Sequence, residues 1–429
     1  MRRTRGILAG FTAVALVATL PAFGAGFGIF EHGSKAMGMA GAFTAQADDP
    51  SALFHNPAGI AFQEERDFMV GLTWITSLEA ELEGANPFPG VGVMREQETL
   101  SETPAHLYWV EPLGDRWTFG LGVFTPFGLT TEWKDPNTFP GRFLSTRAAL
   151  RTFDVAPTVA VEITDTFAVA LSGWVRFSDV ELDQHVPFPN PFTQTISDVA
   201  TVELASDLDN GAGFTVGLLH KPTNSFSWGL SYRSTTEIDY SGDARFTQNL
   251  TGTPLDALVP TALPVGQEIG VETRIEFPDM ASFGVAVALA PRVLVEADAN
   301  WTGWSTFDVL PVDFAIDALD TERVQNFEDA WNYRLGLRFG DPDGSQWRFG
   351  YVFDESPQPE EAVSPLLPDA DRNGFTIGYG YVGNKYTFDV AVMYLDFDER
   401  ERDQSFPGEG AFFGTYQNQA LLLGLSLGF

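Results

Sequence analysis

Long segments of the chain alternate between large apolar residues and small or polar ones. The clearest alternation covers residues 117–123, 282–289, 347–354 and 385–394. Because successive side chains of a strand point to opposite faces, a period of two predicts strands with two chemically different faces. One face carries aromatic and branched side chains, and the other carries glycine, serine, threonine and charged residues. The alternation therefore predicts an all-β fold.

The composition of the two faces favours a transmembrane antiparallel β-barrel. Glycine-rich polar faces with little bulk suit a spacious or plugged lumen, and apolar faces suit contact with lipid. After residue 24 no apolar run reaches the ~20 residues that a membrane-spanning helix needs. A large soluble sandwich or propeller is the alternative that explains the alternation alone, and the two ends of the chain argue against it.

The N-terminal residues have the order of a secretory signal peptide. Three arginines occur within the first five residues, an apolar run follows over residues 6–20, and the small residues Ala22 and Gly24 come next. This order predicts a signal peptide over residues 1–24, with cleavage after Gly24 or, as an alternative, after Ala25. A retained transmembrane anchor is disfavoured because the run is short for a spanning helix.

The last residues of the chain form a separate signal. One face of the predicted terminal strand carries only large apolar residues, which are Leu421, Leu423, Leu425, Leu427 and Phe429. A terminal aromatic residue on such a strand resembles the signal by which outer-membrane barrels are recognised for assembly. The predicted location is therefore the outer membrane of a Gram-negative cell. Its lipids and, through Phe429, the barrel assembly machinery are the expected partners.

Strand and turn signals together predict a barrel over residues 63–429. Turn residues separate about fourteen candidate strands, which begin near Arg66, Glu98, Arg116, Arg147, Thr166, Asp198, Ser225, Glu268, Arg292, Thr321, Gln346, Gly374, Lys385 and Ala411. An even number of strands fits bacterial single-chain barrels. Short turns alternate with longer segments rich in Pro, Asn and Asp, which predicts an up-and-down meander with short periplasmic turns and long extracellular loops.

Charge and composition exclude several classes of function. The formal net charge is −33, and such a field repels phosphate backbones, so nucleic acid is not an expected partner. The acidic excess is expected on solvated loops, and a role for these loops in binding divalent cations stays open. The chain has no Cys, which excludes disulfides, zinc fingers and thiolate catalysis. No phosphate-binding loop of the Gly-Lys-Ser/Thr type, metal site or cofactor site is predicted.

Residues 25–62 differ from the strand pattern. Small residues are concentrated between Ala36 and Ala42, and small residues allow short helices to pack with their backbones close together. Residues 56–59, Asn-Pro-Ala-Gly, form a turn, since Pro57 fixes its own φ and disfavours a helical Asn56. The segment is therefore predicted to fold as a small α-helical hatch inside the lumen. A periplasmic tail is the alternative, and the apolar content of the segment argues against it.

A series of short motifs runs through the chain in a recognisable order. The N-terminal motifs are the Gly-Phe start after the signal peptide, the Gly-rich stretch, Asp-Asp-Pro-Ser-Ala at 48–52 and Asn-Pro-Ala-Gly at 56–59. The later motifs occupy residues 125–129, 301–307, 331–336, 351–357 and 367–372. Together they resemble the FadL/TodX-type family of outer-membrane transporters for long-chain fatty acids and hydrocarbons. The resemblance covers nearly the whole chain after the signal peptide.

The resemblance implies a barrel of fourteen strands plugged by an N-terminal hatch. Members of this family move hydrophobic molecules passively from an external groove to an internal pocket, and then sideways through a gap where one strand is kinked. The resemblance implies that long-chain fatty acids are the favoured substrates of this chain. Neutral aromatic or aliphatic hydrocarbons are the alternative, because acidic loops do not attract carboxylates.

Candidate residues follow from this mechanism. Ligand contacts are predicted for bulky residues near the start of the mature chain and for two basic residues near the extracellular end of a strand, which are Phe27, Ile29, Phe30, Arg147 and Arg151. Hatch anchoring is predicted for Asn56, Pro57 and Ala58, and a strand kink for Gly120 and Gly122, because glycine weakens strand continuity. The alternatives are plug packing for the bulky residues, ion pairing for the arginines and ordinary lumen-facing positions for the glycines.

Two other classes of function stay open. An outer-membrane lipid hydrolase needs a nucleophile and a base within reach of each other, but the five histidines are scattered and no such constellation is readable. No catalytic residue is therefore predicted, and the chain is expected not to be an enzyme. A general porin would have a wet lumen with rings of charge and no hatch.

Overall fold

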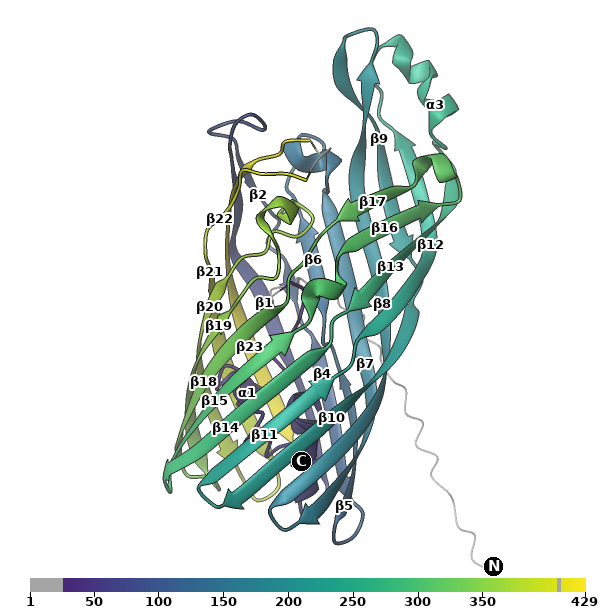
Figure 1. The fold of residues 1–429 in the computed structure, drawn as a ribbon. Helices are drawn as coiled ribbons and strands as arrows, with labels where there is room; N and C mark the ends of the chain where they lie inside the picture. The colour runs from purple at the N-terminus through teal and green to yellow at the C-terminus, as the bar shows by residue number, and fades with distance from the viewer. Residues whose placement is uncertain (1–25, 407–409) are drawn as a thin grey trace, which may run out of the picture.

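The fold is a closed antiparallel β-barrel of 14 strands (Figure 1). The structure, a computed structural model, describes residues 26–406 and 410–429. The predicted signal peptide over residues 1–24, with its cleavage site after Gly24 or Ala25, lies outside the described residues. The predictions of an all-β class, a barrel and about fourteen strands are confirmed.

Several barrel strands consist of consecutive segments. The first half of the barrel comprises β1 (Asp67–Gly84); β2 (Met94–Glu96), β3 (Ser101–Glu102) and β4 (Ala105–Pro112); β5 (Trp117–Phe124) and β6 (Gly128–Glu132); β7 (Arg147–Thr164); β8 (Phe167–Asn190); β9 (Thr195–Ser206) and β10 (Asp209–Thr223); and β11 (Phe226–Arg233) and β12 (Thr236–Gln248). The second half comprises β13 (Glu268–Phe277) and β14 (Met280–Ala290); β15 (Val293–Thr302) and β16 (Val309–Phe314); β17 (Thr321–Val324) and β18 (Ala330–Gly340); β19 (Ser345–Asp354); β20 (Arg372–Val382); β21 (Thr387–Phe397) and β22 (Arg400–Arg402); and β23 (Gly414–Gly428). Two segments belong to one barrel strand when they pair with the same neighbouring strand. For example, β5 and β6 both pair with β7.

The barrel closes because its first and last strands pair. The pairing of β1 with β23 runs from Met69 opposite Gly428 to Gly84 opposite Gly414. A closed sheet has no free edge. Most backbone N–H and C=O groups of the wall therefore find partners in neighbouring strands, as a hydrocarbon environment requires.

The two faces of the wall differ as the alternation predicts. On β18 the large side chains of Tyr333, Leu335 and Phe339 are exposed, whereas Asn332 and Arg334 are buried in the interior. This distribution is the reverse of that in a soluble protein and suits a wall between lipid and a filled lumen. None of the helices in residues 26–406 and 410–429 is long and apolar enough to cross a membrane.

The loops carry short helices, and one part of the wall is taller than the rest. The loop helices are η2 (Pro140–Phe143), η3 (Pro254–Ala257), α3 (Val259–Ala262), η4 (Trp304–Thr306), η5 (Asp317–Leu319) and η6 (Glu360–Ala362). Figure 1 shows β9 rising beyond most other strands at the top of the view, with α3 beside it. The short turns lie at the opposite end of the barrel, which the meander pattern assigns to the periplasm.

Residues 26–62, called the hatch below, lie inside the ring of strands (Figure 1). They form α1 (Ser34–Met37), α2 (Ala52–His55) and η1 (Pro57–Phe62), which are joined by turns. Helix α1 contacts β20, β21 and β23, while η1 contacts β5, β7, β8 and β10. The hatch therefore touches well-separated parts of the wall and fills the space between them.

Two carboxylates of β15 hold the middle of the hatch. Asp298 accepts hydrogen bonds from the backbone N–H groups of Phe43, at 3.0 Å, and Thr44, at 2.9 Å. Glu296 accepts from the backbone N–H groups of Ala45, at 2.6 Å, and Gln46, at 3.1 Å. Each carboxyl group thus bonds two consecutive backbone N–H groups of the hatch. They fix this turn of the hatch against one strand of the wall.

Glycines on the inner face let the hatch approach the wall. A Cβ atom at Gly350 of β19 would lie 2.4 Å from the backbone nitrogen of Ala40 and 2.4 Å from the carbonyl carbon of Met39. Both neighbours are backbone atoms, so neither has room to move. In contrast, a Cβ atom at Gly173 of β8 would have no atom within 4 Å. Only the first glycine is required by the contact between hatch and wall.

Replacing Gly350 by Val is therefore expected to displace the hatch and destabilise the barrel. Overpacking a filled interior costs about 1–3 kcal/mol. The midpoint of thermal unfolding, followed by the change in electrophoretic mobility of the folded barrel, should fall by several degrees. Gly173→Val is the matched control and should leave the midpoint unchanged. Equal midpoints for the two variants would contradict this role of the inner glycines.

Candidate functional site

An apolar cavity lies beside Phe27 at the start of the hatch. Its lining includes Leu129 of β6, Leu150 of β7, Val180 of β8 and Ile275 of β13, and the space between the side chains is about 520 Å³. Almost all of the lining is apolar, so the cavity suits a hydrophobic ligand.

Aromatic rings surround the Phe27 side chain, which is 2% exposed. Its ring centroid lies 4.6 Å from that of Trp304, 5.3 Å from that of Phe307 and 6.0 Å from that of Phe277, each in an edge-to-face arrangement. Edge-to-face packing places positive ring edges against negative faces and stabilises such a cluster. Phe27 therefore forms one wall of the cavity and is held there by its neighbours.

The third barrel strand is interrupted beside this cluster. Its two segments, β5 and β6, are separated by residues 125–127, and Pro126 in this stretch has no backbone N–H to donate to a ladder. The hatch pairs with the interruption instead, because Gly28 forms an isolated antiparallel bridge with Phe127. The N–H of Ile29 donates to the carbonyl of Pro126 at 2.8 Å, and the N–H of Gly128 donates to the carbonyl of Phe27 at 2.9 Å.

The wall has an unpaired seam at the same level. The pairing of β4 with β5 ends at Leu107 opposite Val123, and it resumes as a single bridge between Gln97 and Trp133. Between these points, residues 99–106 and 124–131 form no strand pairing with each other. The interruption of the third strand therefore coincides with the place where the second and third barrel strands separate.

The two glycines predicted to kink this strand lie before the interruption. β5 pairs with β7 at every residue from Trp117 to Phe124, which includes Gly120 and Gly122. A Cβ atom at Gly120 would lie 2.5 Å from Cδ2 of Leu53 in the hatch. Gly120 thus provides room for the hatch, while the strand departs from regular pairing at residues 125–127.

The two arginines predicted to contact a ligand face away from the apolar cavity. Arg147 and Arg151 lie on the face of β7 that also carries the exposed Phe153, whereas Leu150 lines the cavity. Nη1 of Arg151 lies 2.6 Å from a carboxylate oxygen of Asp179. Both arginines also form ion pairs with Glu181. The structure does not bring these arginines together with Phe27.

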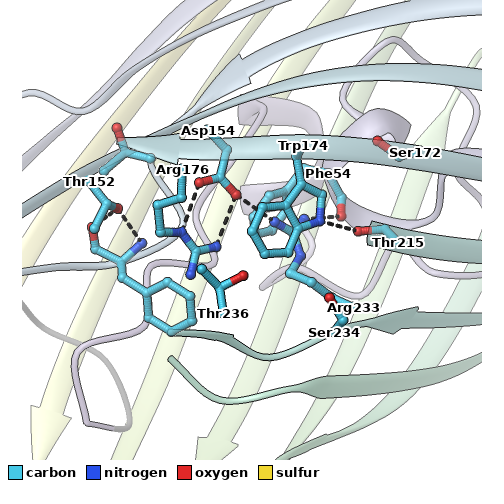
Figure 2. A network of polar contacts seen from close by, with 12 residues as sticks. Phe54, Thr152, Asp154, Ser172, Trp174, Arg176, Thr215, Arg233, Ser234 and Thr236 are labelled. Carbon is cyan, nitrogen blue, oxygen red and sulfur yellow. Dashed lines mark hydrogen bonds and ion pairs between the residues drawn. The ribbon is translucent and has the colours of Figure 1, made fainter. Parts of the chain in front are cut away.

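A buried charged network under the interruption was missed by the sequence interpretation. Figure 2 shows Asp154 of β7 between Arg176 of β8 and Arg233 of β11. Nε and Nη2 of Arg176 lie 2.8 and 3.0 Å from the two carboxylate oxygens, and Nη1 of Arg233 lies 3.2 Å from one of them. The guanidinium of Arg176 also lies 4.6 Å from the ring centroid of Phe127. Charged residues at lumen-facing positions of the alternating pattern are the signal that identifies such a network.

The predicted hatch motif sits between the hatch and the wall. The side-chain NH2 of Asn56 donates to the carbonyls of Thr44, at 2.8 Å, and Leu218, at 3.0 Å. Its side-chain oxygen accepts from the N–H of Ala58 at 3.2 Å. Asn56, Pro57 and Ala58 are all buried. The amide of Asn56 therefore links one hatch turn both to another hatch turn and to β10.

Charge also binds the hatch to the wall. Nζ of Lys35 lies 2.7 Å from Asp48, which in turn lies 3.5 Å from a guanidinium nitrogen of Arg338 on β18. Burial opposes the ionisation of Asp48, but Lys35 and Arg338 hold the pKa of this carboxyl below its usual range. The charged triad joins two turns of the hatch to β18.

Comparison with known proteins places this architecture in a family. Residues 14–429 match the model of the family described as outer membrane protein transport protein (OMPP1/FadL/TodX). The chain is similar to the long-chain fatty acid transport protein of Salmonella typhi, with 26% identity that covers 95% of this chain and 97% of the relative. It is 25% identical to the protein of the same name from Escherichia coli K12, again over 95% of this chain and 97% of the relative.

Solved structures show the same fold. A Pseudomonas aeruginosa FadL homologue superposes with a TM-score of 0.80 at 21% identity, covering 94% of this chain and 99% of that one. The Pseudomonas putida toluene transporter TodX superposes with a TM-score of 0.70 at 17% identity, covering 95% of this chain and 98% of that one. The family match spans the barrel, the hatch and the seam beside the third strand. The chain therefore belongs to the OMPP1/FadL/TodX family of outer-membrane transport proteins.

Proposed function

We propose that the protein moves hydrophobic molecules, principally long-chain fatty acids, passively across the outer membrane and releases them sideways through the wall. The observation that carries the proposal is the position of Phe27, whose side chain lines the apolar cavity while its carbonyl is bonded at the interruption of the third strand. In this proposal residues 1–24 are removed as a signal peptide, residues 25–62 form the hatch and residues 63–429 form the barrel.

In this proposal the ligand reaches the cavity along an apolar path from the tall extracellular part of the wall. A second hollow at that end is lined by Leu204 of β9, Val271 of β13 and Val312 of β16. It shares Val180 and Leu182 of β8 with the cavity beside Phe27. A ligand that moves along these side chains buries its surface at ~25 cal/mol per Å², so its transfer from water needs no external energy source.

The first hatch residues act as the gate in this proposal. Displacement of the Phe27 ring by a ligand moves the backbone that pairs with Pro126 and Phe127, and the seam beside residues 124–131 then becomes continuous with the cavity. Ile29 is the residue whose N–H bond must break, and Phe30 is the next ring on the inner side. Asn56, Pro57 and Ala58 keep the rest of the hatch in place while the first residues move.

Neutral hydrocarbons are a second candidate class of substrate. Among the residues that line the cavity beside Phe27, only Thr273 and Gln325 carry polar side chains. Such a lining accepts an apolar molecule whether or not it bears a carboxylate. Transport of either class needs no catalytic residue, so we propose that the protein is not an enzyme and has no hydrolase activity.

Expression of this protein is expected to raise the uptake of labelled oleate several-fold in Gram-negative cells that lack their own fatty acid transporter. Toluene uptake measured in the same cells tests the second class of substrate. The gain follows from a continuous apolar path where lipopolysaccharide offers none. Absence of a gain for both ligands would contradict the proposed function.

A reversible crosslink between hatch and wall provides the control for the route. The chain has no Cys, so Gly28→Cys with Phe127→Cys creates the only possible disulfide. Opposed residues of a non-hydrogen-bonded antiparallel pair have Cα atoms ~4.5 Å apart, within the ~4.4–6.8 Å that a disulfide spans. The oxidised variant should lose uptake and regain it on reduction. Uptake that is insensitive to the crosslink would place the route elsewhere in the barrel.

Asn56→Ala is expected to loosen the plug and raise ion conductance in planar bilayers. The carbonyls of Thr44 and Leu218 lose their donor, and an unsatisfied buried group costs about 1–3 kcal/mol. Asn249→Ala is the matched control, since Asn249 donates to Asp198, at 2.7 Å, in the extracellular region. High conductance that is the same in the wild type and in a variant lacking residues 25–62 would favour a general porin.

A further inference from the structure

A second cavity lies between the hatch and the wall, and Phe30 is one of the residues that line it. The space between its side chains is about 430 Å³. Its lining divides into an apolar part and a polar part, represented by Phe30, Phe54 and Met280 on one side and Arg233, Arg334 and Asn300 on the other. This division suits a ligand that has both an apolar chain and a polar headgroup.

Arg334 of β18 offers an unused donor to this cavity. The residue is 5% exposed. Its Nε donates to the side-chain oxygen of Asn332 at 2.9 Å, and its Nη1 donates to the carbonyl of Ala40 at 3.0 Å. Within residues 26–406 and 410–429 no acceptor is bonded to its Nη2, and no carboxylate lies within 4.0 Å of the guanidinium. Its Cζ atom lies 4.8 Å from the ring centroid of Phe30.

Arg233 of β11 has only a shared counter-ion. It is 6% exposed, and its carboxylate partner Asp154 also binds Arg176 (Figure 2). Two buried guanidinium groups therefore share one carboxylate, which leaves a net positive charge at the edge of the cavity. The remaining bond of Arg233 goes from Nη2 to the carbonyl of Phe54 at 3.4 Å.

The carboxyl groups around the cavity are engaged elsewhere. None of the residues that line it is an Asp or Glu. Asp298 accepts from the N–H groups of the hatch turn, and Asp354 is paired with Arg372. Burial raises the pKa of Glu31 in the hatch, against the lowering influence of Arg372 and Arg334. His55, which also lines the cavity, is neutral because burial lowers its pKa to about 3.

We propose that this cavity binds the carboxylate of an anionic amphiphile between Arg233 and Arg334, with the adjoining part of its chain against Phe30, Phe54 and Met280. A buried cation without a full counter-ion is costly, and charge-assisted hydrogen bonds to a carboxylate offset that cost. The proposal rests on the proposed function and selects fatty acids over neutral hydrocarbons. It assigns the headgroup to the cavity beside Phe30. Arg147 and Arg151 are not part of this site, because they lie on the outer face of the wall.

The cavity also adjoins the seam in the wall. The guanidinium of Arg233 lies 5.2 Å from the ring centroid of Phe124, which is the last residue of β5 before the interruption. A ligand held by its carboxylate at this point has its chain beside the seam. Release into the membrane then begins with the apolar chain, and the headgroup follows.

Binding of palmitate and 1-hexadecanol to the purified barrel in a non-ionic detergent tests this assignment by titration calorimetry. The two ligands have the same chain length and differ in headgroup charge. The wild type is expected to bind palmitate at least tenfold more tightly than the alcohol. Arg334→Gln should remove this preference while changing the affinity for hexadecanol less than twofold.

The control variants use matched positions. Arg338 lies on the same face of β18 as Arg334, but it is paired with Asp48. The variant Arg338→Gln should therefore keep the preference for palmitate. Arg147→Gln with Arg151→Gln should also keep it. If Arg334→Gln does not fold, Ser282→Asp provides a second test, because Ser282 lines the cavity and a carboxylate there neutralises the arginines and should abolish the preference.

The outcomes separate this inference from the proposed function. Equal binding of palmitate and hexadecanol by the wild type, or loss of the preference in the Arg147 and Arg151 variant alone, would overturn the inference and leave the proposed function standing. Retention of the preference in Arg334→Gln would also overturn it. Failure of the wild type to bind either ligand would count against the proposed function itself.

Discussion

The structure depends on the requirement that each backbone N–H and C=O group within the membrane find a partner inside the protein. Closure of β1 on β23 satisfies this requirement around the ring. In such a wall an interruption is conspicuous, and the one at residues 125–127 is completed from inside. Ile29 and Phe27 of the hatch supply a donor and an acceptor to Pro126 and Gly128. The hatch therefore fills the lumen and also completes the wall.

This arrangement couples the pocket to the gate. The Phe27 ring lines the cavity, and its backbone closes the interruption. Two hydrogen bonds contribute about 0.5–1.5 kcal/mol each, while about 100 Å² of apolar ligand surface contributes about 2.5 kcal/mol when it is buried. The two terms are comparable, so a ligand that packs against the aromatic cluster is able to replace the bonds. Glu296, Asp298 and Asn56 hold the remainder of the hatch, which confines the movement to its first residues.

Much of the barrel was predictable because the period of two depends only on local sequence. The outward side chains of β19 and the start of β7 at Arg147 are examples. The face of Arg147 and Arg151 was harder to predict, since the interior is apolar at the level of the cavity and the outer face there is charged. Polar residues face inward where the hatch fills the barrel. At the level of the apolar cavity the arrangement is reversed, with apolar residues inside and charged residues outside.

Most of the features missed by sequence reasoning depend on contacts between residues that are far apart in the sequence. A kink was predicted at Gly120 and Gly122 because glycine is flexible. The strand is interrupted instead at residues 125–127, where Pro126 lacks an N–H and Gly28, far away in the chain, pairs with Phe127. Arg233 and Arg334 lie on β11 and β18, which are far apart in the sequence. Only closure of the barrel around the hatch brings them to the same cavity.

Hydrogen exchange at the amides of Ile29 and Gly128 tests the coupling of pocket and gate most directly. Comparison of the barrel with and without bound oleate should show faster exchange at these two amides when the ligand is present. The amides of Thr44 and Ala45, which donate to Asp298 and Glu296, should keep their protection in both states. Unchanged protection of Ile29 and Gly128 with oleate bound would contradict the account.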